Sequence, residues 1–199
     1  MGIAIFIEPQ GELKTNLLMW KAKIEENLPS QFYCSHPPHS TLIHVNVKHE
    51  SMAIEIIGKS LQYFSAFKNK VIETGVFWED RATGGGHTLF WKIHPNQLLF
   101  DLQTQVAEAL SPLLANNMAP DFVKKDPALK ESFDRFGYPF IGAHWIPHMT
   151  IASLQTPRNH PLIEEFLNQA GNYEIAVSEV SCWQVKTDQH ICLKNYKLQ

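Results

Sequence analysis

A five-residue string occurs twice in this chain, once in each half. Pro38-His39-Ser40-Thr41-Leu42 and Pro147-His148-Met149-Thr150-Ile151 both read P-H-x-T followed by an aliphatic residue, and 109 positions separate them in a chain of 199 residues. A bare H-x-T triplet is a weak signal, because short motifs also match by chance. The added proline and aliphatic residue, with one copy in each half, make the repeat specific. It predicts two similar lobes within one domain that spans residues 1–199.

Each copy is expected at the beginning of a β-strand. The proline before each histidine disfavours a helix, and the residues that follow are mostly β-branched or aliphatic. Because residues i and i+2 of a strand point to the same face, His39 should lie beside Thr41, and His148 beside Thr150. If the two halves pack about an approximate two-fold axis, the two pairs face each other across a central cleft.

Two facing imidazoles suit the cleavage of a phosphodiester. One takes a proton from the attacking oxygen, and the other gives a proton to the leaving oxygen. The ordinary histidine pKa of about 6.5 lets one ring be neutral and the other charged near neutral pH. We therefore predict that His39 and His148 are catalytic and that the hydroxyls of Thr41 and Thr150 bind the phosphate. This scheme requires no metal ion.

The apolar pattern of the rest of the chain predicts an α+β fold with mainly antiparallel sheets and flanking helices in a bilobal, pseudo-two-fold arrangement. Strands are expected at 2–8, 39–47, 71–78, 88–94, 148–154, 173–185 and 190–198, and helices at 13–28, 52–64, 99–113, 127–136 and 161–170. In the first helix, apolar residues form one face, which leaves these charged residues for solvent: Lys21, Lys23, Glu25 and Glu26.

Composition favours a small anionic ligand over a long nucleic acid. The chain has 17 Lys and Arg against 20 Asp and Glu, a formal charge of −3, so it has no strong positive field. Three cysteines without C-x-x-C spacing argue against a disulfide framework and favour the cytoplasm. No signal peptide or bilayer-spanning run is expected, and no obligate protein partner is evident.

The two motifs resemble the defining feature of the 2H phosphoesterase superfamily, and within it the 2′-5′ RNA ligase and cyclic phosphodiesterase group. The resemblance covers nearly all of the chain, and His39, Thr41, His148 and Thr150 match its functional positions. It implies a metal-independent, cofactor-free phosphodiesterase acting on 2′,3′-cyclic phosphates or 2′,5′ linkages of a small nucleotide or RNA end. Many bacterial relatives carry an arginine three residues after the second threonine, where this chain has Ser153.

Several alternatives remain open. Tyr138, Phe140 and Trp145 precede the second motif and would either stack on a nucleobase or pack in the core. A metal site is the alternative reading of two spacings: Cys34 with His36 and His39, and His144 with His148. For function, the alternatives are a nuclease or oligoadenylate phosphodiesterase acting on longer chains, and a non-catalytic module that binds nucleotides or RNA ends.

Overall fold

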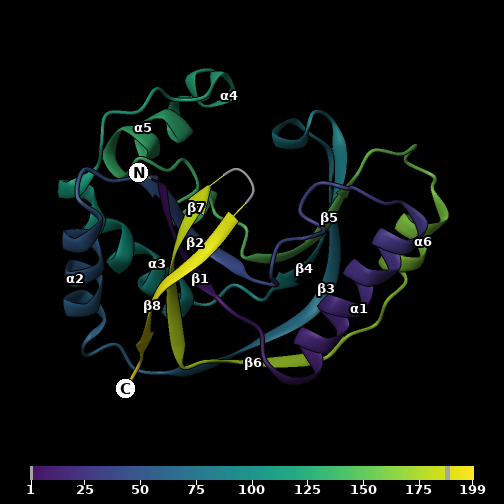
Figure 1. Ribbon diagram of the computed structural model, residues 1–199, viewed down its shortest axis with the longest axis horizontal. Coiled ribbons are helices and arrows are strands. Elements are labelled where there is room, and N and C mark those ends of the chain that lie inside the picture. The colour runs from purple at the N-terminus through teal and green to yellow at the C-terminus, as the bar shows by residue number, and fades with distance from the viewer. Residues whose placement is uncertain (1, 187–188) are drawn as a thin grey trace.

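The computed structural model describes residues 2–186 and 189–199, whose strands form two four-stranded antiparallel sheets (Figure 1). The first sheet has the order β2-β1-β7-β8 and the second the order β5-β4-β3-β6. The strands are β1 Gly2–Ile7, β2 Ser40–Asn46, β3 Phe67–Asp80, β4 Gly86–Ile93, β5 His148–Leu154, β6 Tyr173–Val177, β7 Glu179–Lys186 and β8 Gln189–Lys197. The predicted α+β class with mainly antiparallel pairing is confirmed.

The two motif strands occupy equivalent places. β2 is the edge strand of the first sheet and pairs with β1, whereas β5 is the edge strand of the second and pairs with β4. The two edges approach each other, and Cα atoms of β2 and β5 come within 8 Å. The repeat of the sequence therefore corresponds to a repeat of the topology, with both motifs where the two sheets meet.

In each lobe, one helix follows a strand of one sheet but packs on the other sheet. The helices are α1 Gly11–Asn27, α2 Glu50–Leu61, α3 Gln97–Leu110, α4 Asp121–Lys124, α5 Pro127–Phe136 and α6 Pro161–Leu167. α1 follows β1 of the first sheet but packs on β5 and β6 of the second, and α3 follows β4 of the second but packs on β2 of the first. Figure 1 shows α1 and α6 beside the second sheet and α2 and α3 beside the first. Trp20 of α1 meets Phe166 of α6 edge-on, with ring centroids 5.2 Å apart.

The expectation for one charged residue of α1 was wrong. Lys21 is 6% exposed, whereas we placed it on the solvent face of its helix. It stands four residues after Leu17 and three before Ile24, so the helical period puts it on the buried face. Charge suggested exposure, but a buried ammonium is tolerated where it is hydrogen-bonded.

One predicted strand is two strands in different sheets. The run expected as a single strand at 173–185 divides at Ser178 into β6 of the second sheet and β7 of the first. The buried apolar positions show why: Ile175 and Val177 have odd numbers, and Val180 and Cys182 have even ones. A strand that changes which face is buried has left one sheet for another.

The connection between the lobes contains the helix that the sequence predicted. α5 begins at Pro127, and the side chain of Asp126 accepts hydrogen bonds from the backbone N–H groups of Ala128 and Leu129. It ends at Gly137, which has a φ of 67°. This connection leads into the second motif.

Candidate active site

His39 is fixed by its own backbone and by an aromatic ring. It directly precedes β2, and its Nδ1 lies 2.7 Å from the carbonyl oxygen of Pro37. Its ring stacks on that of Phe6 in β1, with centroids 3.8 Å apart and planes inclined by 21°. Since a carbonyl only accepts, Nδ1 must donate, and Nε2 of the neutral ring is left as the basic nitrogen.

His148, the first residue of β5, is held in the same way. Its Nδ1 donates to the carbonyl oxygen of Ile146 at 2.6 Å, which is again the carbonyl two residues earlier. The edges of Phe77 and Phe90 contact its ring, with centroids 5.0 and 5.1 Å away. Both predicted catalytic histidines thus have the same tautomer, and Nε2 of neither ring is hydrogen-bonded to a described residue.

The two threonines are also placed alike. Thr41 pairs with Phe6, and Thr150 pairs with Phe90. Both are half-buried, as the histidines are, while the residues between histidine and threonine, Ser40 and Met149, are fully buried; neither threonine hydroxyl is hydrogen-bonded to a described residue. Each motif therefore directs its histidine and threonine away from the core, as the period of two predicts.

A β-bulge follows each threonine. The register of β1 with β2 skips Leu42, and that of β4 with β5 skips Ile151. Both skipped residues are 0% exposed. A bulge adds one residue to a strand and re-aims its side chains, which is common next to functional sites. The aliphatic residue that ends each copy of the motif is thus the bulged residue, buried behind the threonine.

Burial makes both histidines weak bases. Desolvation lowers the pKa of His39 to about 3, with a smaller opposing contribution from the bond to Pro37. The pKa of His148 is also lowered by burial, against which the Ile146 carbonyl and the nearby Asp80 carboxylate act. Both rings are accordingly neutral at pH 7 in the free protein. Asp80 favours the charged form of His148 only.

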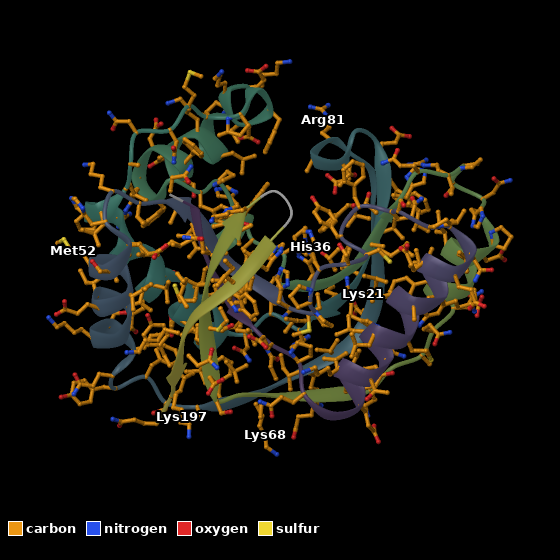
Figure 2. All side chains as sticks on the ribbon, viewed as in Figure 1. Lys21, His36, Met52, Lys68, Arg81 and Lys197 are labelled. Carbon is orange, nitrogen blue, oxygen red and sulfur yellow. The ribbon has the colours of Figure 1, made fainter. Side chains whose placement is uncertain are left out.

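Lys21 ties the two motif regions together. Its Nζ donates to the carbonyl oxygen of Tyr33, in the loop that leads to His39, at 2.7 Å, and to that of Ile151, in the second bulge, at 2.6 Å. Figure 2 shows Lys21 on α1, close to His36 of the same loop. Burial lowers the pKa of Lys21 to about 8, so it is still mostly protonated at pH 7. Sequence reasoning missed this residue, although the helical spacing of α1 marked it.

Asp80 is the second residue that the sequence did not suggest. Its Oδ1 accepts from the backbone N–H of Ala82, and its Oδ2 accepts from the hydroxyl of Thr88 at 2.6 Å. Burial raises the pKa of Tyr33, and the Asp80 carboxylate raises it further. The same carboxylate also favours a higher pKa of His148, against the effect of burial. Tyr33 in turn contacts His36 near His39. One neighbourhood thus contains groups from both motifs.

The three predicted aromatic residues differ in accessibility. Trp145 is 5% exposed, belongs to the core and meets Phe100 edge-on, which fits the core-packing alternative for this residue. Phe140 is half-buried, and its ring packs between those of Phe122 and Tyr138. Tyr138 is half-buried beside Tyr33, and burial raises its pKa.

The spacings that suggested a metal site do not form one here. Among residues 2–186 and 189–199, no three His, Cys, Asp or Glu side chains gather in a way that would hold a metal ion. The thiol of Cys34 donates to the carbonyl oxygen of Lys21, and His144 is exposed in a short 3-10 turn. Ser153, at the position of the arginine in many relatives, is fully buried, and its Oγ lies 2.7 Å from Oγ1 of Thr83.

Two H-x-T motifs on equivalent edge strands of a two-lobed α+β fold define a 2H phosphoesterase architecture. The chain belongs to the 2′-5′ RNA ligase superfamily, because the model of that family matches residues 13–189. Membership supports a phosphodiesterase-type activity. No curated protein matches the chain.

Solved structures share this fold. TT0787 of Thermus thermophilus superimposes with a TM-score of 0.69 at 14% identity, covering 100% of this chain and 98% of that one. Escherichia coli LigT in apo form gives a TM-score of 0.61 at 14% identity, with 100% and 97% coverage. LigT complexed with 3′-AMP gives 0.59 at 15% identity, with 99% and 96% coverage.

Within the described ranges, each helix is too short or too polar to cross a bilayer.

Proposed function

We propose that this protein hydrolyses 2′,3′-cyclic or 2′,5′-linked nucleotide phosphodiesters, with His39 and His148 as acid and base and without a metal ion or other cofactor. The observation that carries the proposal is the duplicated construction of the two histidines. In each, Nδ1 donates to the carbonyl oxygen two residues earlier, and Nε2 is left for proton transfer. A purely structural pair of histidines would not need this shared tautomer beside two unpaired threonine hydroxyls.

For a cyclic phosphate, the reaction is an in-line displacement by water. Nε2 of the neutral histidine takes a proton as the water oxygen bonds to phosphorus, and the other, protonated histidine gives its proton to the ribose oxygen as the bond from phosphorus to that oxygen breaks. The product is a nucleoside phosphomonoester. The hydroxyls of Thr41 and Thr150 donate to the non-bridging oxygens, where negative charge accumulates.

Substrate binding would let one histidine take up the missing proton from solvent. Because burial keeps both histidines neutral in the free protein, one of them must gain a proton before it acts as an acid. An anionic phosphate next to the rings favours their charged form and raises their pKa. A phosphodiester that enters the site therefore favours protonation of one histidine. Asp80 favours His148 as the ring that is protonated.

The proposed substrate is a small nucleotide or an RNA end that bears a cyclic phosphate, which would connect the protein to RNA processing. The formal charge of −3 and the presence of only three arginines fit a short ligand. LigT, whose solved complexes include those with 3′-AMP and ATP, shares the fold. We propose that the protein acts in the cytoplasm, where its three free cysteines would stay reduced, with no membrane or obligate protein partner.

A second candidate is a module that binds nucleotides or RNA ends without turnover. Ser153 favours it, since this buried serine puts a hydroxyl, not a cation, at a position where many relatives have an arginine. A phosphate in the site would then have one positive charge fewer to stabilise its transition state.

Turnover of nucleoside 2′,3′-cyclic monophosphates in EDTA separates the two candidates. We expect the wild type to release one phosphomonoester and both His39→Ala and His148→Ala to lose activity while still folded. His49→Ala is the matched control, because His49 is exposed in front of α2. If a folded wild type turns over neither these substrates nor 2′,5′-linked oligonucleotides, the hydrolase proposal fails and the binding module is favoured.

A further inference from the structure

The loop that precedes the first motif is strained and firmly held. Ser30 and Tyr33 have φ values of 65° and 66°, in the left-handed region that residues with a Cβ rarely adopt. The Lys21 ammonium binds the Tyr33 carbonyl, and the carbonyl of Phe32 accepts from the backbone N–H of Ser153 at 2.8 Å. Such strain persists where the surroundings fix it, often at ligand sites.

This strained loop places aromatic rings in a row beside His39. The Tyr33 ring meets that of His36 edge-on at 5.4 Å between centroids, and His36 lies 4.3 Å from His190 of β8. His190 lies 6.3 Å from His39. Figure 2 shows His36 between the two lobes, near the β7–β8 hairpin. The row thus connects the strained loop and the β7–β8 hairpin to the predicted catalytic ring.

The two added imidazoles have unused polar atoms. Within the part of the chain that the structure describes, no ring nitrogen of His36 or His190 has a hydrogen-bond partner. Both residues are half-buried, and desolvation lowers the pKa of each, that of His36 to about 4. At pH 7 the rings are therefore uncharged. They offer π faces and hydrogen-bonding edges, which suit an uncharged heteroaromatic group better than a second phosphate.

We propose that Tyr33, His36 and His190 form a nucleobase subsite on the His39 side of the reacting phosphate. The proposal rests on the proposed function, because it specifies how that substrate is oriented. The base stacks against the imidazole row, and free ring nitrogens exchange hydrogen bonds with its edge. The reacting phosphate then lies between this subsite and His148.

The test compares a nucleoside with a substrate that lacks the base. We would measure kcat/KM in EDTA for adenosine 2′,3′-cyclic phosphate and for 1-O-methylribose 2,3-cyclic phosphate. Base stacking on aromatic side chains predicts that the wild type prefers the nucleoside by about 5- to 100-fold. The double variant His36→Ala/His190→Ala should lose that preference, because kcat/KM falls much more for the nucleoside than for the base-free substrate.

Two further variants separate stacking from other roles. His36→Phe/His190→Phe keeps the ring faces and should retain most of the preference, whereas His49→Ala should behave as the wild type with both substrates. Equal losses for the two substrates in the alanine double variant would mean that these rings act on His39 and not on a base. An unchanged preference in that variant would also overturn the subsite.

The outcome remains informative if the enzyme proposal fails. If the wild type turns over neither these substrates nor 2′,5′-linked oligonucleotides, the hydrolase function is wrong, and the subsite is judged by binding alone. Calorimetry would then compare 3′-AMP with 1-O-methylribose 3-phosphate. Tighter binding of 3′-AMP that disappears in the alanine double variant supports the subsite; equal affinities in the wild type overturn it.

Discussion

The two motif regions are alike around the histidine nitrogens and different around the ring faces. In both, Nδ1 donates to a backbone carbonyl, a threonine follows, and a bulge buries the next residue. On one side His39 stacks face to face with Phe6 and neighbours other imidazoles; on the other, His148 meets aromatic edges and a carboxylate. The shared backbone hydrogen bonds and threonines fit the proposed transfer of protons by both histidines. The different ring contacts fit a substrate whose two ends differ chemically.

The largest effect should come from removing either shared imidazole. His39→Ala and His148→Ala are each expected to lower kcat by about 10²- to 10⁴-fold, the range that acid and base groups contribute. Steady-state kinetics with a nucleoside 2′,3′-cyclic phosphate checks this, with circular dichroism to establish folding. A large loss in only one variant would break the equivalence of the two halves.

The two threonines should matter next. Thr41→Val and Thr150→Val preserve β-branching and remove one hydroxyl each, so each should lower kcat by about 10²-fold, as losing one donor to a transition-state oxygen does. The same kinetic assay measures both. If KM rises while kcat is unchanged, the hydroxyls bind the ground state and the transition state equally, and their proposed role is wrong.

The link between the halves can be tested through stability. Lys21→Met removes the ammonium and leaves the carbonyls of Tyr33 and Ile151 without this partner, so the free energy of unfolding should fall by about 2 kcal/mol. Lys23→Met, on the same helix, removes an exposed ion pair with Glu165 and should cost less than about 1 kcal/mol. Urea titrations of both variants give the comparison. Equal effects would show that the buried link is not special.

The imidazole-rich side should make the protein sensitive to acid. The pKa of His36 and His39 in the folded state lies below the unfolded value of about 6.5, so between the two the unfolded chain binds protons that the folded chain does not. Stability should therefore fall as the pH drops from 6.5 towards 5. His36→Phe should flatten that slope by less than about 1 kcal/mol per pH unit, measured by urea titration. An unchanged slope would contradict the burial argument.

The smallest effect concerns the side that has a carboxylate. Asp80→Asn keeps a side-chain oxygen that can accept from the backbone N–H of Ala82, but it removes the charge that favours protonated His148. The pKa of His148 should therefore fall while that of His39 stays constant. Histidine NMR titrations would follow both. A similar fall in the pKa of His39 would mean that the Asp80 charge acts on both histidines, which would contradict the difference between the two sides.

Much of the fold could be predicted because its signals are local. Prolines and β-branched residues marked both motif strands, and α5 occupies the residues 127–136 at which a helix was predicted. The division at Ser178 corresponds to a change from odd-numbered to even-numbered buried apolar residues, and neither charge nor β-propensity alone shows that change. The exchange of α1 and α3 between lobes depends on packing across the whole chain, and no local pattern encodes it.

The candidate site was less predictable from the same sequence. His39, Thr41, His148 and Thr150 form a repeat that can be found without a structure. Lys21 was missed because charge is usually a sign of exposure, and the sequence left two alternatives for Trp145 because an aromatic residue near a motif suits the core equally well. His36 and His190 lie 154 positions apart, and only the tertiary fold makes them neighbours.

The strand order of the two sheets determines what a divided chain could do. A cut between β4 and α3 would leave each fragment with two strands of each sheet, and it would part α1 from β5 and β6, and α3 from β2. Each fragment would therefore expose apolar faces that the whole chain buries, and the two fragments would complete both sheets only by binding each other.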